Sequence, residues 1–294
     1  MPDLDRYIPG VPCWIDTNQP DPDAAVDFYG SLFGWELENV MPAESGAKYF
    51  MARIRGGDVA AISSVPEGAP PMATWNTYVW VDSADETAAK VTNAGGKVLA
   101  EPFDVAEAGR MAVFADPDGA VFSVWQAGQH KGAKIVNEAG SLNFNGLHTR
   151  GVEGAKAFYG TVFGWDILTL DGGQQMWTLP GYADYLERDN PGLRENIAKV
   201  GADPGFADVV ASLTTIPDDQ PDIPPHWDVT FAADDADAVA ERATELGGRV
   251  ILPPMDVPWS RMTVIADPEG ATFNATQFVP ENRDLATRAG ASAA

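Results

Sequence analysis

The chain has 294 residues, with 43 Asp and Glu against 19 Lys and Arg, so its formal net charge is −24 at pH 7. So acidic a chain argues against nucleic acid and anionic membrane surfaces as partners, because little basic charge is present to neutralise phosphates. Cys13 is the single cysteine and excludes an internal disulfide. No apolar run approaches the roughly 20 residues that cross a bilayer. With an N-terminus unlike a signal peptide, these features predict a cytoplasmic globular protein.

The first 64 residues predict one strand, one helix and three further strands. Residues 11–17 are the first strand, and Asp21, Pro22 and Gly34 mark the limits of the helix. Apolar residues recur within it at helical spacing and form one stripe: Ala25, Phe28, Tyr29, Leu32 and Phe33. The remaining strands are expected at residues 35–40, 48–54 and 59–64. The segment therefore reads as a β-α-β-β-β module.

A second module of the same kind follows. A strand at 76–81 precedes a helix that opens at Ser83 and ends at Gly95. Three strands come next, at 97–103, 111–115 and 121–126, the last after the tight turn Asp-Pro-Asp-Gly at 116–119. The first half thus holds two modules.

The second half repeats the first. Residues 25–35 read AVDFYGSLFGW and residues 155–165 read AKAFYGTVFGW. The offset grows from 130 residues here to 152 at Trp227, so the second copy carries about 22 additional residues. We predict domains at 9–127 and 142–279, joined by a linker at 128–141. The second domain has an insertion at about 180–205, and a loose tail covers 281–294. Within the insertion, we expect a helix capped by Asn190 and ended by Gly201.

These motifs resemble those of the vicinal oxygen chelate superfamily, which includes glyoxalase I, extradiol dioxygenases and bleomycin resistance proteins. The resemblance implies an α+β fold of two tandem domains. In each, paired β-α-β-β-β modules form a cup-shaped mixed sheet with helices outside, so the chain is a pseudo-dimer in itself, expected as a monomer or weak homodimer. The fold does not by itself specify the function.

Metal-dependent relatives place His, Glu or Gln on inward faces of particular strands. The resemblance maps these ligand positions to three pairs of residues, one member in each copy: Trp14 and Phe144, Asn76 and Asp228, Ser123 and Asn274. Only Asp228 is a usual ligand for a first-row ion, which needs three or four such groups. We therefore predict no metal and no cofactor. One alternative stays open, a metal-dependent lyase or dioxygenase that uses His148, His226 and Asp228.

Alternation along the strands predicts which side chains face each cup. In the first cup, Asp16 is a candidate base or cation partner, and the candidate ligand-binding residues are Trp14, Asn76, Tyr78, Trp80, Ser123 and Trp125. In the second, His148 and Asp228 are candidate acid–base residues, with Thr230 and Asn274 as candidate ligand-binding residues. The same aromatic residues can instead fill the first cup as core.

The expected ligand is a small organic molecule, aromatic ones included. We expect a metal-independent enzyme, and the alternative is a protein that sequesters a drug or metabolite without changing it. The insertion at 180–205 is a lid over the second cup, a brace between domains or a surface excursion. Arg110 and Arg261 occupy matching positions in the two copies, where each binds either a ligand's anion or a neighbouring carboxylate.

Overall fold

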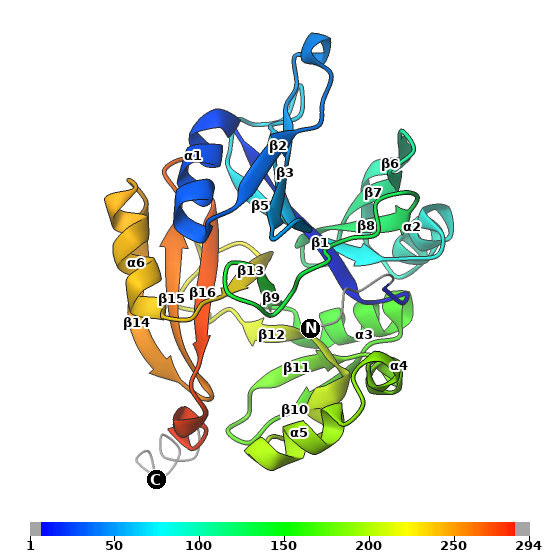
Figure 1. The fold of residues 1–294 in the computed structure, drawn as a ribbon. Helices are drawn as coiled ribbons and strands as arrows, with labels where there is room; N and C mark the ends of the chain where they lie inside the picture. Colours follow the sequence, from blue (N-terminus) through cyan, green and yellow to red (C-terminus); the bar gives the residue numbers. More distant parts are fainter. Residues whose placement is uncertain (1–6, 286–294) are drawn as a thin grey trace.

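The computed structural model describes residues 7–285, in which two eight-stranded mixed sheets and six α-helices form an α+β fold (Figure 1). The first sheet consists of β1 (Pro12–Gln19), β2 (Glu36–Asn39), β3 (Tyr49–Ile54), β4 (Gly57–Ser64), β5 (Thr74–Trp80), β6 (Lys97–Val105), β7 (Gly109–Ala115) and β8 (Val121–Ala127). The second consists of β9 (Leu142–Thr149), β10 (Asp166–Thr169), β11 (Gln175–Thr178), β12 (Val209–Thr215), β13 (His226–Ala232), β14 (Arg249–Val257), β15 (Ser260–Ala266) and β16 (Thr272–Phe278). The helices are α1 (Pro22–Phe33), α2 (Ala84–Asn93), α3 (Val152–Phe163), α4 (Tyr182–Asp189), α5 (Leu193–Val200) and α6 (Ala236–Glu245).

The two sheets have the same strand order. In the first it is β2-β3-β4-β1-β5-β8-β7-β6, and in the second β10-β11-β12-β9-β13-β16-β15-β14. Within each sheet two modules meet at an antiparallel pair, β1 with β5 and β9 with β13. This confirms the predicted repeat of paired β-α-β-β-β modules. The part of the predicted tail from residue 286 on lies outside the described residues.

Helices α1 and α3 begin by different means although their sequences match. In α1, Asp21 Oδ1 accepts hydrogen bonds from the backbone N–H groups of Asp23 and Ala24, as an N-cap does. The N-cap position of α3 is Gly151, which has no side chain to do this. Asp118 of the first domain replaces it, because its Oδ2 accepts from the backbone N–H groups of Arg150 and Gly151. The start of α3 is therefore held by the other domain.

The apolar stripes of α1 and α3 also pack across the domain boundary. The hydroxyl of Tyr29 on α1 donates to Asp267 Oδ2 of the second domain over 2.9 Å, and the ring centroids of Phe33 and Phe231 lie 4.8 Å apart. Tyr159 on α3 donates to Asp116 Oδ2 of the first domain over 3.1 Å. Figure 1 shows the consequence, with α1 beside α6 and α2 beside α3. The helices lie outside the cups as predicted, and the surface they cover belongs partly to the other half of the chain.

The insertion contains two helices, of which only the second was expected. Helix α5 begins after Gly192, whose φ of 89° is left-handed, so the prediction that Asn190 caps this helix is wrong. Asn190 instead ends α4, the helix that was not predicted. Asp208 fixes the start of α4 by accepting from the backbone N–H of Ala183 over 2.7 Å. No helix within residues 7–285 is long and apolar enough to span a membrane.

Candidate functional site

A buried carboxylate lies at the centre of the first cup. Asp16 on β1 is 4% exposed, and its Oδ1 accepts from Asn76 Nδ2 over 2.8 Å. Its Oδ2 accepts from the hydroxyls of Tyr78, over 2.9 Å, and Tyr49, over 3.1 Å. Burial raises the pKa of this carboxyl, and the three hydrogen bonds oppose that shift. Three donors therefore satisfy the Asp16 carboxyl, which the sequence pattern predicted to lie in this cup.

Aromatic rings fill the rest of the first cup. His130, from the predicted linker, lies against two of them, with its ring centroid 4.4 Å from that of Trp14 and 5.7 Å from that of Trp125. Burial lowers the pKa of His130, which favours the neutral imidazole. Three other predicted ligand-binding residues are buried as well, namely Tyr78, Trp80 and Ser123. Asn76 is half-buried. The first cup thus has the packing of a core, which is the alternative interpretation of its aromatic residues.

The second cup holds a histidine–carboxylate pair. His148 Nε2 on β9 lies 2.9 Å from Asp228 Oδ2 on β13, and both side chains keep partial exposure. Asn274 Nδ2 on β16 donates to Asp228 Oδ2 over 2.7 Å and to Thr230 Oγ1 over 3.1 Å. These four predicted residues therefore form one connected network.

A second imidazole stacks on the first. The rings of His226 and His148 are nearly parallel, with 7° between their planes and 4.7 Å between their centroids. His226 Nδ1 lies 2.8 Å from the carbonyl oxygen of Pro224, which can only accept, so Nδ1 carries the proton. Burial lowers the pKa of His226, so its ring is neutral near pH 7.

An open cavity of about 330 Å³ adjoins this network. Its walls include His148, His226, Asp228 and Asn274, together with residues that the sequence did not single out: Thr214, Thr215, Ile216, Pro217, Gln220, Ile223 and Val264. Most of the added residues come from the end of β12 and the loop that follows it. Helices α4 and α5 of the insertion contribute none of the lining residues, so the cavity is formed without a lid from the insertion.

The donor set of the second cup does not fit the metal ion that the resemblance would imply. A first-row ion needs three or four nitrogen, oxygen or sulfur donors aimed at one point. The rings of His148 and His226 lie in nearly parallel planes, so their in-plane lone pairs do not meet at one point, and Asn274 presents its amide N–H, not a lone pair, to Asp228. Across residues 7–285, no three His, Cys, Asp or Glu side chains are arranged to hold a metal. His148, His226 and Asp228 do converge, as one interpretation of the sequence expected, but as a hydrogen-bonded and stacked group.

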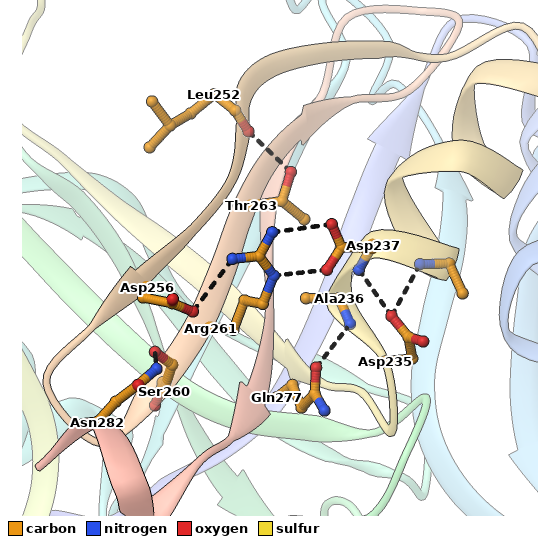
Figure 2. Close-up of polar contacts among 11 residues, drawn as sticks. Asp235, Ala236, Asp237, Leu252, Asp256, Ser260, Arg261, Thr263, Gln277 and Asn282 are labelled. Atoms are coloured by element: carbon orange, nitrogen blue, oxygen red, sulfur yellow. Dashed lines mark hydrogen bonds and ion pairs between the residues drawn. The ribbon is translucent and has the colours of Figure 1, made fainter.

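The two matching arginines bind carboxylates of their own domain. Figure 2 shows Arg261 between Asp237 at the start of α6 and Asp256 on β14, with Nη2–Oδ1 of 2.9 Å and Nη1–Oδ1 of 3.1 Å respectively. Arg110 makes the same pair of contacts with Asp85 and Asp104. Each arginine ties a helix to an edge strand, which confirms the second of the two interpretations of these residues.

Comparison with known proteins identifies the relationship. Residues 14–124 match the Glyoxalase/Bleomycin resistance protein/Dioxygenase superfamily, and residues 146–276 match a Glyoxalase-like domain. The Mn(II)-bound glyoxalase from Novosphingobium aromaticivorans has a similar fold, with a TM-score of 0.59 at 17% identity over 92% of this chain and 82% of that chain.

Two curated relatives align over almost the whole length of the chain. "Putative glyoxylase CFP32" of Mycobacterium tuberculosis is 37% identical over 284 residues, which is 96% of this chain and 100% of the relative. "Anthracycline biosynthesis protein DnrV" of Streptomyces peucetius is 33% identical over 290 residues, 94% of this chain and 96% of the relative. The chain therefore belongs to the Glyoxalase/Bleomycin resistance protein/Dioxygenase superfamily.

Proposed function

We propose that the protein is a metal-independent enzyme that removes a proton from the carbon next to a carbonyl group, in a small organic molecule bound in the second cup. The observation that carries this proposal is the pairing of His148 with Asp228 at 2.9 Å on the wall of a cavity of about 330 Å³. Kinship with a protein named as a glyoxylase supports small-molecule chemistry of this kind. The predicted catalytic residues His148 and Asp228 thereby keep their roles.

The proposed base is one nitrogen of His148. An ionised carboxylate only accepts hydrogen bonds, so Nε2 carries the proton that faces Asp228 and Nδ1 carries the free lone pair. Nδ1 takes the proton from the substrate carbon, the electron pair of the broken C–H bond forms a carbon–carbon double bond, and the π pair of the carbonyl moves to its oxygen. Asp228 then stabilises the imidazolium, and return of the proton to the same carbon completes the cycle.

Neutral donors that line the same cavity suit the developing enolate oxygen. Thr214, Thr215 and Gln220 line the cavity and carry hydroxyl and amide groups that can donate to it. Asn274 acts through Asp228 by donating to its Oδ2, and Thr230 accepts a hydrogen bond from the same amide group. A base and hydrogen-bond donors that line one cavity are what proton abstraction next to a carbonyl requires.

The first cup lacks both members of this pair. In the first sheet, Asn18 on β1 lies opposite Thr74 on β5. The equivalent pair in the second sheet is His148 on β9 and His226 on β13, so Asn18 takes the place of His148. By the same register Asn76 takes the place of Asp228. We therefore infer that Asp16 is structural and that the first cup is a scaffold, which leaves the proposed catalysis to the second.

The test is proton exchange measured by NMR. The protein is incubated in D₂O with α-hydroxyacetophenone and a chelator, and deuterium at the α-carbon is followed over time. We expect exchange by the wild type, a loss of about 10²- to 10⁴-fold in His148→Ala, and no change in Asn18→Ala, the matched variant of the first cup.

Three outcomes contradict parts of the proposal. Exchange that stops with chelator and returns with a metal ion refutes metal independence. Equal rates for His148→Ala and the wild type refute the assignment of the base. Saturable binding of the probe with no exchange favours sequestration, the alternative function, over catalysis.

A further inference from the structure

We propose that the second cup takes a substrate that carries a positive charge beside its carbonyl group, such as an ammonium. The inference rests on the proposed function, since it names the substrate class of the same site. The charge balance of the cavity and its rim carries it.

The cavity wall is negatively charged. Among the described residues that line it, Asp228 is the one anionic side chain, and no Lys or Arg is present. Asp228 is partly buried, with 17% of its side chain exposed, so water screens its charge incompletely. Hydroxyl and amide groups can donate hydrogen bonds to an anionic substrate, but they cannot neutralise its charge. An anionic substrate would therefore meet like charge without compensation.

The loop on one side of the cavity adds charge of the same sign. Pro217, Gln220 and Ile223 line the cavity, and between them in the chain lie three exposed aspartates, Asp218, Asp219 and Asp222. Carboxylates in a loop that lines a partly enclosed space raise the local concentration of cations.

One arginine offsets part of this negative charge. Arg150 Nη2 donates to the backbone carbonyl of Gln220 over 2.6 Å, so it brings one positive charge to the loop that carries the three aspartates. Arg261 is paired with Asp237 and Asp256 (Figure 2). Burial lowers the pKa of His226 and so favours its neutral form. Asp228 and the three aspartates of the loop thus outnumber the positive charge that Arg150 brings.

The cavity also has an apolar part. Ile216, Pro217, Ile223 and Val264 line it together with the polar network. A molecule with an apolar body, a carbonyl and a cationic group would match all three parts of the lining.

The experiment compares three phenyl ketones that differ in charge. Phenacyltrimethylammonium is cationic, phenyl neopentyl ketone is its neutral isostere, and 3-benzoylpropanoate is anionic. Binding is followed through the NMR shifts of the His226 ring. At about 0.01 M ionic strength we expect the cation to bind about tenfold more tightly than the neutral isostere and the anion most weakly. The preference should fall to about twofold near 1 M, where the Debye length is only about 3 Å.

Variants of the loop locate the source of the preference. Combined replacement of Asp218, Asp219 and Asp222 by Asn should lower the cation preference severalfold and leave the affinity for the neutral isostere unchanged. The matched control changes net charge equally on the exposed surface of the first domain, with Asp27→Asn, Glu36→Gln and Glu44→Gln. It should leave the preference intact.

The outcomes separate the two proposals. Equal affinity for the cation and its isostere, loss of the preference in the control variant, or no binding of any probe overturns this inference. Deuterium exchange into α-hydroxyacetophenone together with no cation preference refutes the charge inference alone. Cation preference without exchange of any probe refutes the proposed catalysis alone.

Discussion

The backbone of β9 passes close to the carboxylate of Asp228 at Gly146. A Cβ at this position would meet Asp228 Oδ1, and it would lie 2.7 Å from Ser212 Oγ. The residue opposite Gly146 in the sheet is Asp228 itself, so the lack of a side chain at Gly146 leaves room for the Asp228 carboxylate. The glycine is thus part of what keeps Asp228 in reach of His148.

Gly146→Ala should therefore reduce catalysis. The new methyl group pushes Asp228 away from His148, and we expect the exchange rate to fall at least about tenfold, within the range that positioning a base contributes. Gly154→Ala is the control, because a Cβ there meets no atom within 4 Å, and its rate should equal that of the wild type. A fully active Gly146→Ala protein would show that the position of Asp228 is not critical.

The raised pKa of Asp16 predicts that the stability of the fold depends on pH. Burial raises the pKa of its carboxyl above the unfolded value of about 3.9, so the folded state binds this proton more tightly than the unfolded state. The stability that Asp16 contributes is then fully present below about pH 3.9 and is lost as pH rises through the folded pKa. Asn binds no proton at this position.

We therefore expect the free energy of unfolding of Asp16→Asn, relative to wild type, to increase as pH rises from about 4 to 7. Urea denaturation at several pH values measures it. A difference that is constant across this range, or that moves the other way, would contradict the assignment. Exchange activity in the second cup should be unaffected by the change.

Most of the candidate network could be predicted at the level of single residues. Alternation along β9, β13 and β16 places His148, Asp228, Thr230 and Asn274 on one face, and the structure joins them by hydrogen bonds. Tyr49 follows the same alternation on β3 and could have been included. His130 and Ile223 lie in segments without periodicity, where only tertiary contacts decide which way a side chain points.

At the scale of elements, α1 and α3 connect the two halves of the chain. The hydroxyl of Tyr29 donates to Asp267 and accepts from Trp75 Nε1 over 3.1 Å, and Tyr159 is bound in the same way by Asp116 and Trp227. The stripe on each helix could be predicted from its spacing. Its partner could not, because spacing indicates that a residue is buried and not against which strand it packs.

Tyr29→Phe should lower the free energy of unfolding by about 1–3 kcal/mol, since it leaves the buried Trp75 N–H without an acceptor. Tyr182→Phe is the matched control, because no described residue hydrogen-bonds to the Tyr182 hydroxyl, and it should cost much less. Chemical denaturation of both variants decides the matter. Equal losses would show that the Tyr29 hydroxyl contributes little to joining the domains.

At the scale of the whole molecule, the hydrophobic cores do not follow the order of the chain. One core cluster combines Phe28 and Tyr29 of α1 with Phe231 and Phe273 of the second sheet. The other combines Phe158 of α3 with strands of the first sheet. Each tandem domain thus depends on the other for part of its buried apolar surface.

Separated halves should therefore fold poorly. Residues 1–134 and 135–294 expressed alone should lack a cooperative unfolding transition, because each exposes a helix stripe that is buried in the intact chain. Mixing or co-expressing them should restore the transition. A single half that unfolds cooperatively would contradict the shared core.

The central claim is that His148 and Asp228 act together as one base in the second cup. The most direct measurement compares α-carbon exchange rates for His148→Ala, Asp228→Asn and the double variant. Residues that act as a unit give strongly non-additive losses. We predict that the double variant loses no more activity than His148→Ala alone. A double variant whose loss equals the product of the two single losses would contradict the pair.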